Sequence, residues 1–274
     1  MTKAQDLQAK IAAAKAVSAD YNEIVKGAGS EPPAAGETPM RLVEYVELGK
    51  HEGEWEGKKK INTKVELVFE LIGKKHPPKE FDGVKYPVTI RVTENIGQGE
   101  KSQFRKLFAM MNYKGTATTM VEFLGEPFLG TVFHSKSKDG KMTYANLRDE
   151  NGYRVGRPSR EDLDTGEQVA VNVGPALTEL KLFVWATADM DDWNALYVEG
   201  EYEERKDDKG NVTSPARSKN RRQELIRKAL NWNECAVHDA VEAGGQEVHI
   251  PDDDVTDQIP ASTGGAAADP LEAM

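Results

Sequence analysis

Two stretches, residues 41–48 and 64–71, show the clearest alternation of side-chain classes along the chain. Side chains at every second position of a strand share one face, so the pattern predicts two β-strands of a hairpin. The side chains expected to face a core are Val65, Leu67, Phe69 and Leu71. The side chains expected to face water are Lys64, Glu66 and Glu70.

Residues 49–60 lie between these strands and are expected to form a long loop, because Gly49, Gly53 and Gly57 interrupt the pattern. Long loops in compact domains are more often functional than idle. This loop also holds an aromatic residue and a run of cations, namely Trp55, Lys58, Lys59 and Lys60. It is therefore a candidate binding element.

Further elements follow along the chain. Residues 85–93 predict a third strand, and residues 100–111 predict a helix from the spacing of their apolar side chains. Residues 118–124 predict a second short helix. Residues 127–135 and 142–148 predict two more strands, joined by a turn that contains Asp139 and Gly140, a strong hairpin signal.

Five strands with a helix between the third and the fourth is the element order of the OB-fold, although other β-rich folds share it. We expect a mainly β chain with α additions (α+β). Its core would be an OB-fold-like five-stranded Greek-key barrel, with an N-terminal helix and a C-terminal extension. The expected domains are an amphipathic helix over 1–27, a linker over 28–37, the barrel with its extension over 38–235, and a tail over 236–274.

The regions around the barrel have weaker patterns. The helix over residues 1–27 either packs on the domain or contacts a second copy of the chain, which would make a homo-oligomer. Residues 28–37 are rich in Gly and Pro, which disfavour helix and central strand. Beyond residue 148 we expect a strand at 180–185, a short helix at 191–196, a charged loop at 201–215 and a helix at 219–232.

The net charge of −10 comes entirely from one end of the chain. From residue 229 onward there are ten Asp or Glu and no Lys or Arg, so the rest of the chain carries 36 acidic and 36 basic residues. A neutral body can still bind a polyanion, whereas the tail should repel one. We expect the tail to be unstructured until a partner binds it. Its acidic cluster is Asp252, Asp253, Asp254 and Asp257.

No catalytic signature is present. The sequence lacks the common nucleotide-binding, zinc-protease and nucleophile motifs, and its five histidines are scattered. Its single cysteine, Cys235, cannot form an intrachain disulfide, which suits a reducing compartment. No apolar run approaches the roughly 20 residues that cross a bilayer, and the first residues lack the apolar block of a signal peptide. We expect a cytoplasmic protein that is not an enzyme and has no cofactor, metal site or membrane contact.

Binding of single-stranded DNA is a better match to the composition of the body. A groove for single strands needs cations along the phosphate path and aromatic faces on which bases stack. Lysines and aromatic residues alternate through the candidate body, although a solvated strand edge is an alternative explanation of the lysine runs. The residues predicted to bind single-stranded DNA are Trp55, Lys58, Lys59, Lys60, Lys74, Lys75, Tyr86, Arg91, Lys141, Tyr144 and Arg148.

Several segments of the body also resemble a known family. They are PPAAG (32–36), VELVFEL (65–71), KLFAMMNY (106–113), FLGTVFH (128–134) and YANLRD (144–149). Over roughly residues 1–235 the chain resembles single-stranded-DNA-binding proteins of tailed bacteriophages. The resemblance implies an OB-fold, coating of single strands in phage DNA replication or recombination within the host cytoplasm, and an acidic tail that meets replication partners. The chain ends without the terminal aromatic residue common in such tails, which leaves partner docking less supported than DNA binding.

Two other classes of protein stay open. A phage structural or interaction protein would use the barrel to bind protein and the tail for solubility. A nuclease would use the tail carboxylates to hold a divalent cation, although adjacent carboxylates in a tail are more often only a charged tail.

Overall fold

The computed structural model describes residues 31–244, except for 56, 82, 138, 139, 141 and 207–209; the side chains of Trp55, Phe81 and Arg205 are also not described. The predicted N-terminal helix over 1–27, Lys141 and the acidic cluster at 252–257 therefore lie outside the described residues. The description below concerns the unit that begins at residue 32.

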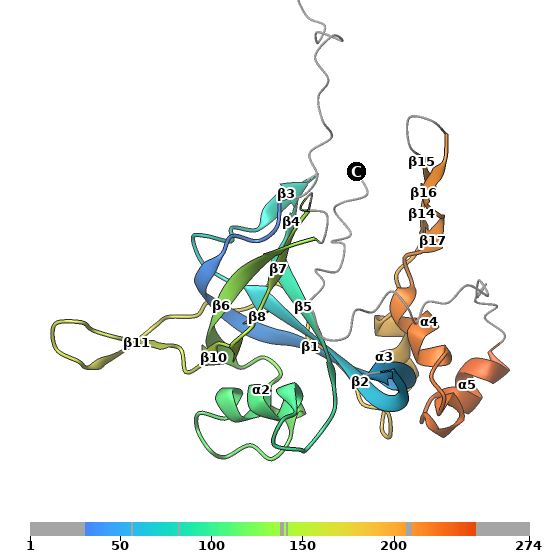
Figure 1. Ribbon diagram of the computed structural model, residues 1–274, viewed down its shortest axis with the longest axis horizontal. Helices are drawn as coiled ribbons and strands as arrows, with labels where there is room; N and C mark the ends of the chain where they lie inside the picture. Colours follow the sequence, from blue (N-terminus) through green and yellow to red (C-terminus); the bar gives the residue numbers. More distant parts are fainter. Residues whose placement is uncertain are drawn as a thin grey trace, which may run out of the picture. The chain divides into compact units, whose positions relative to one another are not determined.

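The described part is mostly β structure, organised around one seven-stranded sheet in the order β10-β6-β1-β2-β5 (Figure 1). In addition, β7 pairs with β6, and β13 runs parallel to β1. No pairing joins β5 to β7 within the described residues, so the expected closed barrel is not present there. The strands of this sheet are β1 (Gly36–Trp55), β2 (Lys58–Leu71), β5 (Val88–Asn95), β6 (Pro127–Lys136), β7 (Thr143–Asn146), β10 (Val155–Gly156) and β13 (Lys181–Phe183).

Short strand pairs and short helices surround the sheet. The strand pairs are β3 (Lys79–Phe81) with β4 (Val84–Tyr86), β8 (Arg148–Asp149) with β9 (Gly152–Tyr153), β11 (Ser159–Glu161) with β12 (Gln168–Ala170), β14 (Glu201–Tyr202) with β17 (Arg217–Ser218), and β15 (Arg205–Lys206) with β16 (Val212–Ser214). The helices are α2 (Gln103–Met111), α3 (Met190–Ala195), α4 (Arg221–Arg227), α5 (His238–Ala243) and the 3-10 turns η1 (Met120–Phe123) and η2 (Trp232–Glu234). Among the described residues, no helix is long and apolar enough to cross a membrane.

The loop expected over residues 49–60 is instead mostly strand. β1 and β2 stay paired from Met40 opposite Leu71 to Trp55 opposite Lys58. The register shifts between Glu47 and Gly49, where Gly49 has a φ of +83° that glycine adopts without strain. The glycines therefore mark an irregularity and a tight turn within one long hairpin, rather than the ends of two strands.

The first core lies on the face of the sheet predicted to be apolar. The side chains predicted to face the core, Val65, Leu67, Phe69 and Leu71, are buried there, which confirms the prediction for these positions. They belong to the same cluster as Leu107 of α2 and aromatic side chains of η1 and β6. Phe123 packs edge-on against Phe128 with ring centroids 6.0 Å apart. The predicted helix over 100–111 thus begins at Gln103 and covers this core.

The prediction that Lys64, Glu66 and Glu70 face water is wrong. Their exposed fractions are 9%, 0% and 3%. The reason is that residues 173–178 and α4 cover the face on which they lie, which we call the outer face. Glu70 accepts hydrogen bonds from the backbone N–H groups of Leu177, at 2.8 Å, and Thr178, at 2.8 Å.

Arg41, which lies opposite Glu70 in the β1–β2 pairing, binds the beginning of the same covering segment. Its guanidinium donates to the carbonyl oxygens of Val173 at 2.9 Å, Gly174 at 2.6 Å and Gly125 at 2.6 Å. Because both Arg41 and Glu70 are satisfied by backbone groups of residues 173–178, this segment is fixed across the sheet by charge-assisted hydrogen bonds.

A second core joins the C-terminal elements to the far half of β1. Val46 and Leu48 of β1 are buried with Phe183, Trp193 and Ile226. Cys235 and Val241 also belong to this cluster. The folded part therefore extends through α5, past the boundary at residue 235 that the sequence pattern suggested.

We predict that Gly49→Ala destabilises the fold by about 2–5 kcal/mol. An alanine methyl would lie 2.4 Å from the Trp185 ring and 2.6 Å from the Ala229 Cβ, in addition to the strain of the positive φ. Gly57→Ala is the matched control, because Gly57 has a φ of +75° but no atom near its missing methyl. It should cost only about 1–2 kcal/mol. Urea unfolding of both variants measures the difference, and equal losses would contradict close packing of the second core on Gly49.

Candidate nucleic-acid interface

Exposed lysines gather at the end of the sheet where β2 finishes and β5 begins. The connection between them contains the β3–β4 hairpin, and β7 lies at this same end (Figure 1). We call this region the basic end and define it by Lys74, Lys75, Lys79, Lys85 and Lys136, whose side chains are exposed. Their arrangement suits contact with a polyanion.

Three contacts hold the parts of the basic end together. His76 lies 3.0 Å from the Thr38 hydroxyl through Nδ1 and 3.1 Å from the Ala34 carbonyl oxygen through Nε2. His134 of β6 lies 2.8 Å from the Pro33 carbonyl oxygen through Nε2. Residues 33–38 thus bridge the lysine-bearing turn after β2 to the strand that leads to Lys136.

Two predicted stacking residues lie at the basic end. Tyr86 ends β4 opposite Lys79, and Tyr144 of β7 pairs with Ser135. Both tyrosines are partly exposed, and the Tyr144 hydroxyl lies 3.8 Å from the Met142 sulfur. A partly exposed ring held by its own strand can offer a face to a base.

The lysines at the β1–β2 hairpin tip form a separate group. Lys58, Lys59 and Lys60 are exposed, and Lys59 lies 3.5 Å from Glu52. Lys60 and Leu71 are eleven residues apart in β2, which corresponds to at most about 36 Å at about 3.3 Å per residue. The predicted site is therefore divided between two ends of one strand.

Arg91 and Arg148, also predicted to bind DNA, are already paired with buried carboxylates. Arg148 Nη1 lies 2.8 Å from Glu94 Oε1, and this carboxylate also accepts from the Tyr153 hydroxyl. Burial raises the pKa of Glu94, against the opposing effect of both partners. Arg91 Nε lies 3.2 Å from Glu66 Oε1. Much of the charge of these two arginines is thus balanced within the protein.

Glu66 is the centre of the ion-pair cluster on the outer face. Arg222 Nε donates to it at 2.6 Å, Arg221 Nη1 at 3.3 Å, and Arg222 also pairs with Glu44. Burial alone would raise the pKa of Glu66, but the three guanidinium groups outweigh it and lower the pKa to about 2. The carboxylate stays ionised, and it fixes α4 onto β2 and β5.

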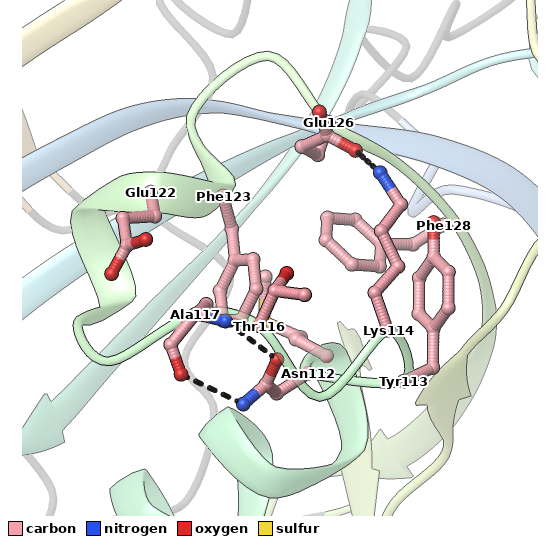
Figure 2. Close-up of a pocket in the computed structure, with 10 residues that line it drawn as sticks. Asn112, Tyr113, Lys114, Thr116, Ala117, Glu122, Phe123, Glu126 and Phe128 are labelled. Atoms are coloured by element: carbon pink, nitrogen blue, oxygen red, sulfur yellow. Dashed lines mark hydrogen bonds and ion pairs between the residues drawn. The ribbon is translucent and has the colours of Figure 1, made fainter.

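A shallow hollow of about 100 Å³ lies where α2, η1 and β6 meet (Figure 2). The Asn112 amide closes its loop by bonding both backbone groups of Ala117, at 2.9 and 3.1 Å. At its other side Lys114 pairs with Glu126 at 2.7 Å. Sites for small molecules usually measure about 300–1,000 Å³, so we assign no ligand to this hollow. In the described part of the chain, no three His, Cys, Asp or Glu side chains are grouped to hold a metal ion.

The predicted set of residues leaves out Lys79, Lys85 and Lys136, which the fold brings to the same end of the sheet as Lys74 and Lys75. Lys85 alternates with Val84 and Tyr86 in β4, and this alternation is the sequence signal that places it. The position of Lys136 beside the other lysines depends on pairing between β6 and the start of β1, which no local pattern reveals.

Comparison of the chain with protein-family models, curated proteins and solved structures finds no match.

We predict that Glu66→Gln destabilises the protein by about 3–5 kcal/mol, because the buried Arg222, the largely buried Arg91 and the partly exposed Arg221 would lose their shared anion. Glu37→Gln is the control, since Glu37 forms an exposed pair with Arg160, and it should cost less than about 1 kcal/mol. Urea unfolding at neutral pH gives both values. Similar losses would contradict the central role of Glu66.

The same pair of proteins, wild type and Glu66→Gln, should respond differently to acid. The folded-state pKa of Glu66, about 2, is lower than its ordinary value of 4.5. Its stabilisation is therefore present above pH 4.5 and is lost as the pH falls through about 2. The stability difference between the two proteins should shrink over this interval in unfolding curves measured at successive pH values. A constant difference would contradict the lowered pKa.

Proposed function

We propose that the protein binds single-stranded DNA with little dependence on sequence and does so without catalysis. The observation that carries the proposal is the basic end, where exposed lysines of the β2–β3 turn, β3, β4 and β6 lie at the same end of the sheet as the partly exposed rings of Tyr86 and Tyr144. Cations and stacking faces in one place are the two requirements for holding single strands.

The fold supports the proposal through its strand order. In the sheet, the strands lie side by side in the order β5, β2, β1, β6 and β7. Along the chain, α2 lies between β5 and β6. This arrangement supports an OB-fold-like architecture, a common carrier of single strands. Side chains of Glu94, Arg148 and Tyr153 connect β5 to β8 and β9, near the point where a barrel would close. We infer an OB-fold variant whose closure depends on side chains.

The route of the DNA would run from the basic end toward the hairpin tip. The part of β2 between the two groups, from Lys60 to Leu71, is at most about 36 Å long, which suits the roughly 4–16 nucleotides that one OB-fold covers. Between the basic end and the hairpin tip, α4 and residues 173–178 cover the outer face. The DNA would therefore follow the edge of the sheet formed by β5 rather than the centre of the sheet.

The acidic tail would act on the same site. Seven of the ten acidic residues that follow residue 229 lie beyond α5, with no Lys or Arg among them, so this segment can compete with DNA for the lysines and recruit replication or recombination proteins when displaced. Its effect on DNA affinity should decline with salt.

We predict that Lys74→Gln with Lys75→Gln weakens binding to a labelled oligo-dT and lowers the salt slope by about 1.4, at about 0.7 per phosphate contact. Lys101→Gln with Lys106→Gln is the control, because it removes the same charge from exposed positions beside and on α2. Fluorescence anisotropy across a salt series measures both. Equal effects of the two pairs would locate the interface elsewhere, and no binding by wild type at low salt would favour an interaction protein.

Tyr144→Ala should weaken oligo-dT binding by about 1–3 kcal/mol with little change in the salt slope, because a lost stack removes no charge. Tyr144→Phe keeps the ring and should bind like wild type. Trp55→Ala and replacement of Lys58, Lys59 and Lys60 test the hairpin tip in the same assay, with loss of affinity expected from the first and a flatter slope from the second. Unchanged binding in Tyr144→Ala would remove this ring from the interface.

A further inference from the structure

Positive charge exceeds negative charge where β2, β5 and α4 meet on the outer face. The cluster contains the cations Lys64, Arg91, Arg221 and Arg222 and the carboxylates Glu44 and Glu66. The carboxylates are bound mainly by Arg222 and Arg91, so the excess falls on Lys64 and Arg221. Cations grouped without matching anions are costly when they are withdrawn from water.

Lys64 is the least compensated of these groups. Its exposed fraction is 9%, and no ion pair or hydrogen bond reaches its ammonium group within the described part of the chain. Burial lowers the pKa of Lys64, and the neighbouring charge of Arg221 lowers it further. The residue directly opposite on β5 is Asn95, whose side chain is exposed and polar.

The side chain of Arg221, in the same cluster as Lys64, is partly exposed to solvent. Its side chain is 42% exposed and makes one contact with Glu66 at 3.3 Å, whereas Arg222 binds the opposite oxygen at 2.6 Å. A guanidinium carries five N–H donors, so Arg221 has donors left for another acceptor. Half-buried Thr93 of β5, which pairs with Glu66 in the sheet, adds a polar side chain nearby.

We infer that Lys64 and Arg221 form a binding site for a phosphate group. An oxyanion between them would balance the excess charge and accept hydrogen bonds from an ammonium and a guanidinium, the two donors that phosphate prefers. The identity of the ligand rests on the proposed function: if the protein binds single-stranded DNA, the ligand is a backbone phosphate of DNA that lies along the β5 edge. The same chemistry would also accept free inorganic phosphate.

A purely structural role explains Lys64 poorly. Glu44 and Glu66 keep their guanidinium partners without it, and an apolar or neutral side chain at this position would avoid burying an unpaired charge. A residue that weakens the free protein but strengthens the complex is expected at a binding site.

The first test measures oligo-dT binding by the full-length chain carrying Lys64→Gln or Arg221→Gln. Each should bind about 5- to 10-fold more weakly at low salt and lower the salt slope by about 0.7, as expected for one lost phosphate contact to a single strand. Lys101→Gln, which removes an exposed charge just before α2, should leave both values unchanged. Lys64→Arg and Arg221→Lys keep the charge and should retain most of the affinity.

The second test uses inorganic phosphate as the probe and thermal unfolding as the readout. Phosphate should raise the Tm of wild type above its value in chloride at equal ionic strength, and this increase should vanish in Lys64→Gln and Arg221→Gln. In the absence of phosphate, the Tm of Lys64→Gln should not fall below that of wild type. A lower Tm there would assign Lys64 to the fold and overturn the inference.

The two tests separate the possible failures. If wild type binds oligo-dT and both neutral variants bind equally well with the same salt slope, the phosphate site is wrong while the DNA-binding proposal stands. If no protein binds oligo-dT but phosphate still stabilises wild type and not the variants, the proposed function is wrong while the phosphate site stands. Loss of both responses in wild type overturns both.

Discussion

The ionised carboxylate of Glu66 is the point on which the arrangement of the C-terminal elements depends. It has no exposed surface and is bound by arginines from β5 and from α4. Burying a charge is costly unless opposite charges accompany it, so α4 must pack on the outer face whenever Glu66 is folded into the sheet. The second core, with Trp193 and Ile226, then forms between α4 and the far half of β1.

Covering the outer face has a functional consequence. In an uncovered sheet, the polar side chains of β2 would be available to a ligand; here Glu70 is used by backbone N–H groups and Glu66 by arginines. Exposed cations of the sheet and its hairpins are found at the basic end and at the hairpin tip, and Arg221 is partly exposed beside the outer face. The structure thus separates buried charged side chains that hold the elements together from exposed ones, even though both sets contain Lys, Arg and Glu.

The apolar face of the sheet was predictable because it follows from the pattern of neighbouring residues within one strand. Apolar side chains at Val65, Leu67, Phe69 and Leu71 recur at every second position, and side chains with this period share one face of a strand. The helix that begins at Gln103 was predictable for the same reason. The hairpin over residues 49–60 was missed because glycine permits both a loop and an irregular strand. Of the candidate site, Lys74, Lys75, Tyr86 and Tyr144 lie at the same end of the sheet, whereas Arg91 and Arg148 lie in internal ion pairs.

By itself, the sequence determined the positions of the main strands, the apolar face of the sheet and the separation of a neutral body from an acidic tail, since each follows from neighbouring residues or from simple counting. Only the tertiary structure decided what happens to the polar face. The partners of Glu66 on α4 lie 155 and 156 residues further along the chain, and the groups that bind Glu70 lie 107 and 108 residues away. An alternating pattern indicates which side chains are polar. Whether water or an opposite charge interacts with such a side chain depends on which distant segment folds over it.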